Sequence, residues 1–185
     1  MNHTYGTILV DPPWTYDNAG IRGAASKQYP AMSDATIYKI PVASFAAPDC
    51  ALLLWATWSK LVEATKIIET WGFEYVTGFP WVKVTDVRRT LFGDLRIKVR
   101  YGIGFWARGV TEPLLIARRG KVSPPDNGFI GLLSPNLSHS RKPDSVYEYG
   151  EALPGPRLEM FARRKRAGWD AWGNEIENDV AIATP

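Results

Sequence analysis

The feature that most constrains the fold of this chain is a short apolar run that ends in an acid, two prolines and a tryptophan. Residues 5–10 are apolar and β-branched enough to predict a buried strand, and Asp11, Pro12, Pro13 and Trp14 follow it directly. Ligands bind at the carboxyl edge of the strands in open α/β sheets, so this sequence predicts a rigid functional lip at that edge. The simpler alternative is a proline turn after a strand, with Trp14 in the core.

The chemistry of this lip suits a flat ring that carries an amino group. The carboxylate of Asp11 and the backbone carbonyl of Pro12, held in place by Pro13, can accept the two hydrogens of an NH2 group. Trp14 adds an aromatic surface on which such a ring can stack. The sequence therefore predicts a binding site for an aromatic amine at the end of the first strand.

Composition limits the class of protein. With 185 residues, the chain is expected to form one domain over 1–185. Its single cysteine, Cys50, excludes an internal disulfide, and His3 and His139 lack metal-ligand spacing, so we expect no metal. The start of the chain has no secretory signal pattern, and the longest apolar run is too short to cross a bilayer. We therefore expect a cytoplasmic protein without membrane contact.

Beyond the lip, apolar runs typical of strands alternate with helical spacing. Residues 61–71 carry apolar side chains at helical spacing, Gly72 ends that helix, and Pro143 begins another that stops at Pro154. Further strands are predicted over 51–56, 75–82, 112–117, 157–161 and 169–172. This order predicts an α/β domain with a mostly parallel sheet.

The segment 83–108 interrupts this alternation and is predicted to be a nucleic-acid-binding loop. Aromatic residues lie among and beside its basic ones, a combination that suits phosphates and unstacked bases. The alternative is a solvated loop whose aromatic side chains are tucked into the core. The candidate contacts are Lys83, Arg88, Arg89, Arg96, Lys98, Arg100 and Arg108.

From about Tyr5 to Ile176 the chain resembles the adenine-N6-specific methyltransferase family with the Asp-Pro-Pro-Trp motif. This is the family of the catalytic subunit of mRNA adenine methyltransferase, and it has many bacterial and phage members. Besides Asp-Pro-Pro-Trp, five matching stretches occur in the family's order: Tyr29-Pro30-Ala31-Met32-Ser33, Trp71-Gly72-Phe73, Trp81-Val82-Lys83, Arg141-Lys142-Pro143-Asp144 and Trp172-Gly173-Asn174-Glu175.

The resemblance implies a Rossmann-like, S-adenosylmethionine-dependent fold with helices on both faces of the sheet and a circularly permuted motif order. It implies that Asp11, Pro12, Pro13 and Trp14 are catalytic. It also implies that Tyr29 closes over the target base, although a tyrosine there could equally anchor its loop to the core. The implied cofactor-binding residues are Asp11, Lys142, Phe161, Arg163, Asn174 and Glu175.

Three of these cofactor residues have a physical role that fits the cofactor. Lys142 precedes a predicted helix and suits the methionine carboxylate, while Asn174 and Glu175 follow the last strand, where an acid can bind a ribose diol. The simpler alternatives are a solvent-facing lysine and a strand-end turn. One departure stands out, because residues 164–168 (Arg-Lys-Arg-Ala-Gly) replace the histidine and asparagine of the eukaryotic enzyme, so those contacts are not transferred.

The leading hypothesis is methylation of adenine N6 in DNA, because the chain shows neither the zinc-ligand clusters nor the appended RNA-binding module of the RNA enzymes that it resembles. It also shows no large target-recognition insert, so we expect sparse readout of the bases. The first alternative is the same reaction on RNA, and the second is a catalytically silent nucleic-acid-binding subunit. Such subunits lose the acid or tryptophan of the lip, whereas Asp11 and Trp14 are both present here. The expected partners are DNA or RNA, and a second copy of the chain in a homodimer.

Overall fold

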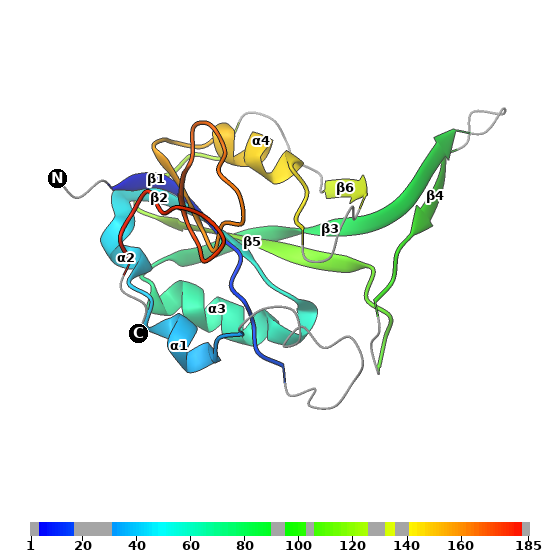
Figure 1. The fold of residues 1–185 in the computed structure, drawn as a ribbon, viewed down its shortest axis with the longest axis horizontal. Helices are drawn as coiled ribbons and strands as arrows, with labels where there is room; N and C mark the ends of the chain where they lie inside the picture. Colours follow the sequence, from blue (N-terminus) through cyan, green and yellow to red (C-terminus); the bar gives the residue numbers. More distant parts are fainter. Residues whose placement is uncertain are drawn as a thin grey trace.

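The molecule is built on a mixed sheet in the strand order β4-β3-β5-β2-β1-β7-β8, with β6 pairing with β3 (Figure 1). The computed structural model describes residues 4–16, 31–89, 95–102, 106–125, 132–135 and 141–182, with only the backbone described at 89, 95, 96 and 132–135. The strands are β1 (Tyr5–Val10), β2 (Ala46–Trp55), β3 (Glu74–Arg89), β4 (Leu95–Val99), β5 (Thr111–Arg119), β6 (Leu132–Pro135), β7 (Arg157–Met160) and β8 (Asp170–Trp172).

The first strand lies inside the sheet, as the sequence predicted. β1 pairs in parallel with β2 on one side and β7 on the other, and all six of its residues are buried. β7 and β8 are the last strands in the chain, yet β7 pairs with β1. The half of the sheet that is predicted to bind the cofactor therefore comes last in the sequence. This is the permuted order that the resemblance implied.

Helices cover both faces of the sheet (Figure 1). The helices are α1 (Asp34–Tyr38), α2 (Val42–Phe45), α3 (Leu61–Thr70) and α4 (Ser145–Glu151). α1 and α3 pack Ile37, Ile67 and Ile68 against one face, whereas α4 packs Val146 and Tyr147 against the other. The predicted α/β class with two helical layers is confirmed. None of the helices in the described part of the chain is long and apolar enough to span a membrane.

The sheet contains more antiparallel pairing than the sequence indicated. β5 runs antiparallel to both of its neighbours, β2 and β3, and β4 is antiparallel to β3. The reason is connectivity, because β3, β4 and β5 follow one another without the helical crossover that parallel neighbours need. The parallel half, β2-β1-β7-β8, is the part that carries the predicted lip.

The prediction of a loop over 83–108 is wrong for its first half. β3 continues to Arg89 and pairs with β4, and together they form a two-stranded arm that projects from the body (Figure 1). Val87 and Ile97 face each other on one side, whereas Asp86 and Lys98 face each other on the opposite side. Charged and apolar residues alternate along these strands, so the sequence resembles a charged loop. In the described structure the apolar side chains of the arm are not covered by the core.

We expect the arm to open far more readily than the centre of the sheet. Val87, Ile97 and Val99 remain 39–44% exposed, so opening the β3–β4 ribbon uncovers little new apolar surface. Hydrogen exchange should therefore be orders of magnitude faster at the amides of β4 than at Leu52–Leu54 of β2. Equal protection of the two strands would contradict this expectation. Measurement at two protein concentrations controls for association through the arm.

Candidate active site

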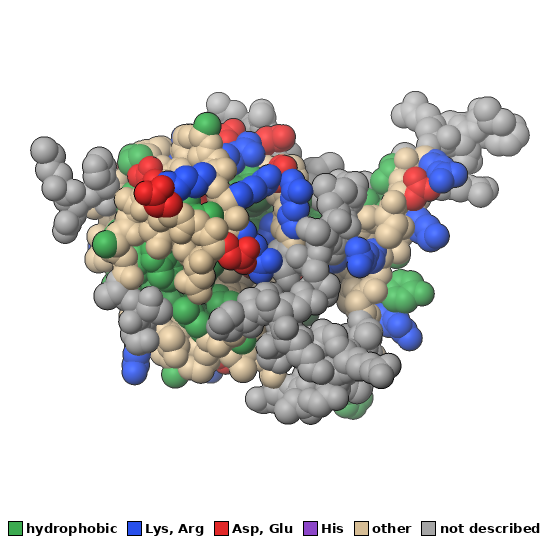
Figure 2. Space-filling model, viewed as in Figure 1, with side chains coloured by type: hydrophobic (Ala, Val, Ile, Leu, Met, Phe, Trp, Pro, Cys, Tyr) green, Lys and Arg blue, Asp and Glu red, His purple; other side chains and the backbone are tan. Residues whose placement is uncertain are grey.

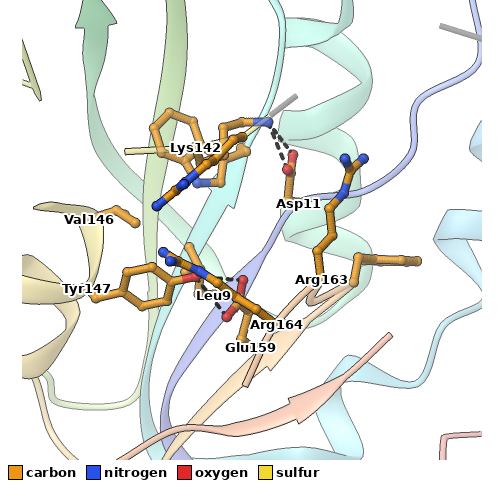
Figure 3. Close-up of a pocket in the computed structure, with 11 residues that line it drawn as sticks. Leu9, Asp11, Lys142, Val146, Tyr147, Glu159, Arg163 and Arg164 are labelled. Atoms are coloured by element: carbon orange, nitrogen blue, oxygen red, sulfur yellow. Dashed lines mark hydrogen bonds and ion pairs between the residues drawn. The ribbon is translucent and has the colours of Figure 1, made fainter. Parts of the chain in front are cut away.

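A cavity of about 220 Å³ lies at the carboxyl ends of β1 and β7, as predicted for the sheet edge (Figure 3). Its wall is formed by the ends of these strands, the end of β2, and the chain that leads into and along α4. The lining residues are Leu9, Asp11, Trp55, Arg141, Lys142, Val146, Tyr147, Glu159, Phe161, Arg163 and Arg164. The cavity thus brings together four of the six predicted cofactor residues.

An ion pair between Asp11 and Lys142 forms one end of the cavity (Figure 3). The Lys142 Nζ lies 2.7 Å from Asp11 Oδ1 and 2.8 Å from Oδ2, and it stands 5.5 Å from the centre of the Trp55 ring. Both side chains are largely shielded, at 18% and 28% exposure. Lys142 is therefore not the solvent-facing lysine that the sequence left as an alternative.

Glu112 extends this pair into a chain of alternating charges. Its Oε2 lies 3.5 Å from Lys142 Nζ, and its Oε1 accepts a hydrogen bond from Lys83. Burial alone would raise the pKa of the Glu112 carboxyl, but the ammonium groups of Lys142 and Lys83 outweigh it and hold that pKa below its usual value. The sequence analysis missed Glu112, because an acid before Pro113 in an apolar strand carries no motif.

This chain of charges also changes the interpretation of Lys83. The sequence analysis assigned Lys83 to the nucleic-acid surface, but its ammonium group pairs with Glu112 and only 20% of the side chain is exposed. Lys83 lies at the base of the arm and supports the cavity wall. The sequence did not reveal this role, because Lys83 begins the basic segment and only the pairing of β3 with β5 brings it to Glu112.

Glu159 and Tyr147 form a second buried pair in the cavity wall (Figure 3). The Tyr147 hydroxyl donates to the Glu159 carboxylate at 2.9 Å. Burial, assisted by the nearby charge of Asp11, raises the pKa of Glu159 to about 7 in spite of this hydrogen bond and the neighbouring arginines. Neither residue could be recognised from the sequence, because no motif surrounds Tyr147 in its helix or Glu159 in its strand.

Glu159 should make stability fall with rising pH over a defined range. The unfolded chain releases this proton near pH 4.5 and the folded protein only near pH 7. The contribution of the neutral carboxyl is therefore complete below pH 4.5 and is lost as the pH rises to 7. Glu159→Gln keeps an acceptor for Tyr147 and should be more stable than the wild type above pH 7, by up to about 3 kcal/mol.

Urea unfolding as a function of pH measures this difference. Glu148→Gln, at an exposed position on α4, is the matched control and should leave the shape of the pH profile unchanged. Parallel profiles for the wild type and Glu159→Gln would show that folding does not raise the pKa of Glu159.

The lip itself differs from its prediction in one respect. Trp14 is only 4% exposed and lies in the core, where its Nε1 donates to the Trp55 carbonyl at 3.2 Å. The prediction of an open stacking surface on Trp14 is therefore wrong, and the core position left as the alternative is correct. The Trp14 amide also donates to the Pro12 carbonyl at 2.9 Å, which fixes the turn. From its place in the core, Trp14 thus holds Asp11 and Pro12 in position.

The predicted cofactor turn lies between β7 and β8. Phe161 has a positive φ of 63°, and its ring packs edge-on against Trp172 at 5.1 Å. The next strand approaches so closely that a Cβ on Gly173 would lie 2.0 Å from the Ala162 carbonyl oxygen. Asn174 and Glu175 are exposed beyond the cavity wall, and Glu175 is tied to it by an ion pair with Arg163 at 3.6 Å.

The basic residues that replace the eukaryotic histidine and asparagine have separate roles. Arg164 lines the cavity and pairs with Asp144. Lys165 pairs with Asp179 at 2.6 Å, and Arg166 pairs with Glu151 at 3.3 Å, and neither lines the cavity. Only Arg164 is therefore placed to contact a ligand there.

The remaining nucleic-acid residues lie along the arm and the chain that follows it. Arg88, Lys98, Arg100 and Arg108 are exposed, and basic side chains are visible along the arm in Figure 2. Arg108 also stands 5.3 Å from the centre of the exposed Tyr101 ring. Tyr29 and the side chains of Arg89 and Arg96 lie outside the described part of the structure.

Comparison with known proteins places the site in a wider context. Residues 5–175 match the MT-A70 family. The chain is 30% identical to the Type II methyltransferase M.MunI of Mycoplasma sp, over 97% of this chain and 82% of that protein. It is 31% identical to the human N(6)-adenine-specific methyltransferase METTL4, over 94% of this chain and 38% of that protein. It is 30% identical to the N6-methyladenosine RNA methyltransferase MTA1 of Pyricularia oryzae, over 93% and 47% respectively.

Proposed function

Because the chain belongs to the MT-A70 family, whose members use S-adenosylmethionine as methyl donor, we propose that it methylates the N6 amino group of adenine in DNA. The observation that carries this proposal is the Asp11 carboxylate, which follows β1 directly, lines a cavity of mixed charge and is followed in the chain by Pro12. DNA is favoured over RNA by the extent of the similarity. The match covers 82% of M.MunI, which is a DNA methyltransferase, but only 47% of MTA1, which is named as an RNA methyltransferase.

The charges in the cavity fit S-adenosylmethionine. Lys142 would bind the cofactor's carboxylate, and the carboxyl groups of Asp11 and Glu159 would face its ammonium group. Glu175 and Asn174, at the end of β8, would bind the ribose hydroxyls. When bound, the cofactor supplies an electrophilic methyl group.

The lip has acceptors left for the target amine. Each Asp11 oxygen accepts one bond from Lys142, and the Pro12 carbonyl accepts one from the Trp14 amide, so each of these three oxygens retains acceptor capacity. By accepting the two N–H bonds of adenine, Asp11 and Pro12 draw the nitrogen toward a tetrahedral shape and free its lone pair. The nitrogen attacks the methyl carbon as the bond from carbon to the sulfonium sulfur breaks, and the proton that the methylated nitrogen then loses can pass to the Asp11 carboxylate or to water. The rest of the protein contributes by positioning and electrostatics. In duplex DNA the base must first leave the stack.

Replacement of Asp11 by asparagine tests the acceptor role. Asp11→Asn keeps the size of the side chain but removes the charge and one acceptor, so we expect methyl transfer to fall by roughly 10²–10³-fold. Mass spectrometry of nucleosides from DNA and RNA incubated with protein and S-adenosylmethionine measures the product. Trp14→Ala is unsuitable for this purpose, because it would open a cavity in the core.

The chain offers a closely matched control in Asp34→Asn. Asp34 forms an ion pair with Lys60 at 2.8 Å, with side-chain exposures of 30% and 15%, and neither residue lines the cavity. This variant should methylate at the wild-type rate. Near-normal turnover by Asp11→Asn would show that Asp11 has no role in the reaction. Methylated product found in RNA alone would show that the substrate is RNA and not DNA.

The arm is the part of the molecule to which we assign the DNA backbone. Its charged side carries Arg88 and Lys98, which point away from the apolar Val87–Ile97 side. Arg88 pairs with Asp86 at 2.5 Å on this side and remains exposed. Exposed cations on an open ribbon suit phosphates, which position the strand without reading its sequence. The apolar side, which is uncovered in the described structure, is our candidate surface for a second copy of the chain in a homodimer.

Removing two cations from the arm should weaken the dependence of binding on salt. If Arg88 and Lys98 both contact phosphates, the double variant Arg88→Gln/Lys98→Gln should reduce the slope of log K against log salt by about 2. Fluorescence titration of labelled DNA at several salt concentrations measures this slope. The control, Lys39→Gln/Lys66→Gln, removes the same charge from exposed positions near α1 and α3 and should leave the slope unchanged. Equal slopes in all three proteins would remove the arm from the interface.

A further inference from the structure

Two arginines in the cavity wall share a single carboxylate. Arg141 Nη2 lies 3.2 Å from Asp144 Oδ2, and Arg164 donates to Oδ1 of the same side chain. All three side chains are about half exposed, at 43%, 43% and 49%, so a ligand can reach them. They come from two segments, since Arg141 and Asp144 lead into α4 whereas Arg164 follows β7.

This arrangement leaves one positive charge without a carboxylate of its own. Among the described residues around the cavity, Lys142 pairs with Asp11, Lys83 pairs with Glu112 and Arg163 pairs with Glu175. Only Arg141 and Arg164 must share one acid. Glu159 offsets this surplus only in part, because burial raises its pKa to about 7, so the carboxyl is partly protonated near neutral pH.

The methyl donor does not supply the missing negative charge. S-adenosylmethionine carries one carboxylate, one ammonium and one sulfonium, so its binding adds positive charge to the cavity. Its carboxylate has a cation in Lys142, deeper in the cavity than the exposed arginines. The surplus at Arg141 and Arg164 therefore calls for an anion from the second substrate. Two guanidinium forks match the paired oxygens of a phosphate.

We propose that Arg141 and Arg164, held in place by Asp144, bind a phosphate next to the target adenosine, so that the site selects a nucleotide within a strand over a free nucleoside. The proposal rests on the proposed adenine methylation. In the free protein Asp144 keeps the two guanidinium groups together. When the strand binds, the phosphate becomes a further acceptor for both guanidinium groups.

Direct titration of small ligands tests this clamp without knowledge of the target sequence. Adenosine, adenosine 5′-monophosphate and adenosine 3′-monophosphate are titrated calorimetrically, at low salt, into the full chain saturated with S-adenosylhomocysteine, the demethylated cofactor. In the wild type, one of the monophosphates should bind roughly tenfold or more tightly than adenosine, as expected for one charge-assisted hydrogen bond. Arg141→Gln and Arg164→Gln should each remove most of this preference.

Two controls separate the clamp from other roles. Affinity for S-adenosylhomocysteine should be the same in the wild type and in both variants, which also shows that the variants are folded. Arg118→Gln removes an arginine of similar exposure, 46%, that pairs with Glu74 away from the cavity, and should keep the full preference.

Each other outcome has a definite meaning. Equal affinity for all three ligands, or no binding of any of them, would overturn the clamp. A variant that loses affinity for S-adenosylhomocysteine but keeps the preference for phosphate would place the arginines on the cofactor carboxylate, which also overturns it. Failure of the proposed function is a separate result, because it appears as the absence of N6-methyladenine from both DNA and RNA in the nucleoside analysis.

Discussion

The contact of the Lys142 ammonium with two carboxylates is the interaction on which the cavity depends. Lys142 precedes α4, whereas Asp11 follows β1 and Glu112 belongs to β5, so one cation joins three parts of the fold. Burial opposes the charged form of Glu112, and the cations beside it restore that form. Lys83, which pairs with Glu112 from β3, completes an alternating sequence that leaves no net charge at this end of the cavity.

The two shielded glutamates of the site show how neighbours decide ionisation. Burial opposes the charged form of both, yet the pKa of Glu112 is lowered by two ammonium groups while that of Glu159 is raised to about 7. Permanent ion pairs therefore occupy one end of the cavity, and a carboxyl that titrates near neutral pH occupies the other. This difference in charge between the two ends can orient a ligand that carries both a carboxylate and an ammonium group. The methionine part of the cofactor carries both groups.

The centre of the sheet and the β3–β4 arm differ in how firmly they are held. β1 is paired on both sides and buried throughout, so the acid at its end is held by the most stable part of the protein. In the part of the chain that the structure describes, β4 pairs with β3 alone, and the arm exposes its apolar side chains. A fixed reaction centre with a deformable arm suits a substrate whose backbone must be followed while one base is removed from its stack.

By itself, the sequence determined the buried first strand, the acid–proline lip at the sheet edge, the helices on the two faces and the position of Lys142 in the cofactor half. The strand and the lip follow from local patterns within residues 5–14, whereas the two helical layers and the cofactor role of Lys142 followed from the family resemblance. Only the tertiary structure decided that Trp14 and Lys83 point inward, that Glu112 and Glu159 join the site and that the basic segment begins as a ribbon. The reason is physical: an alternating strand pattern does not say which side meets the core, and Asp11 meets Lys142 across 131 positions through the pairing of distant strands.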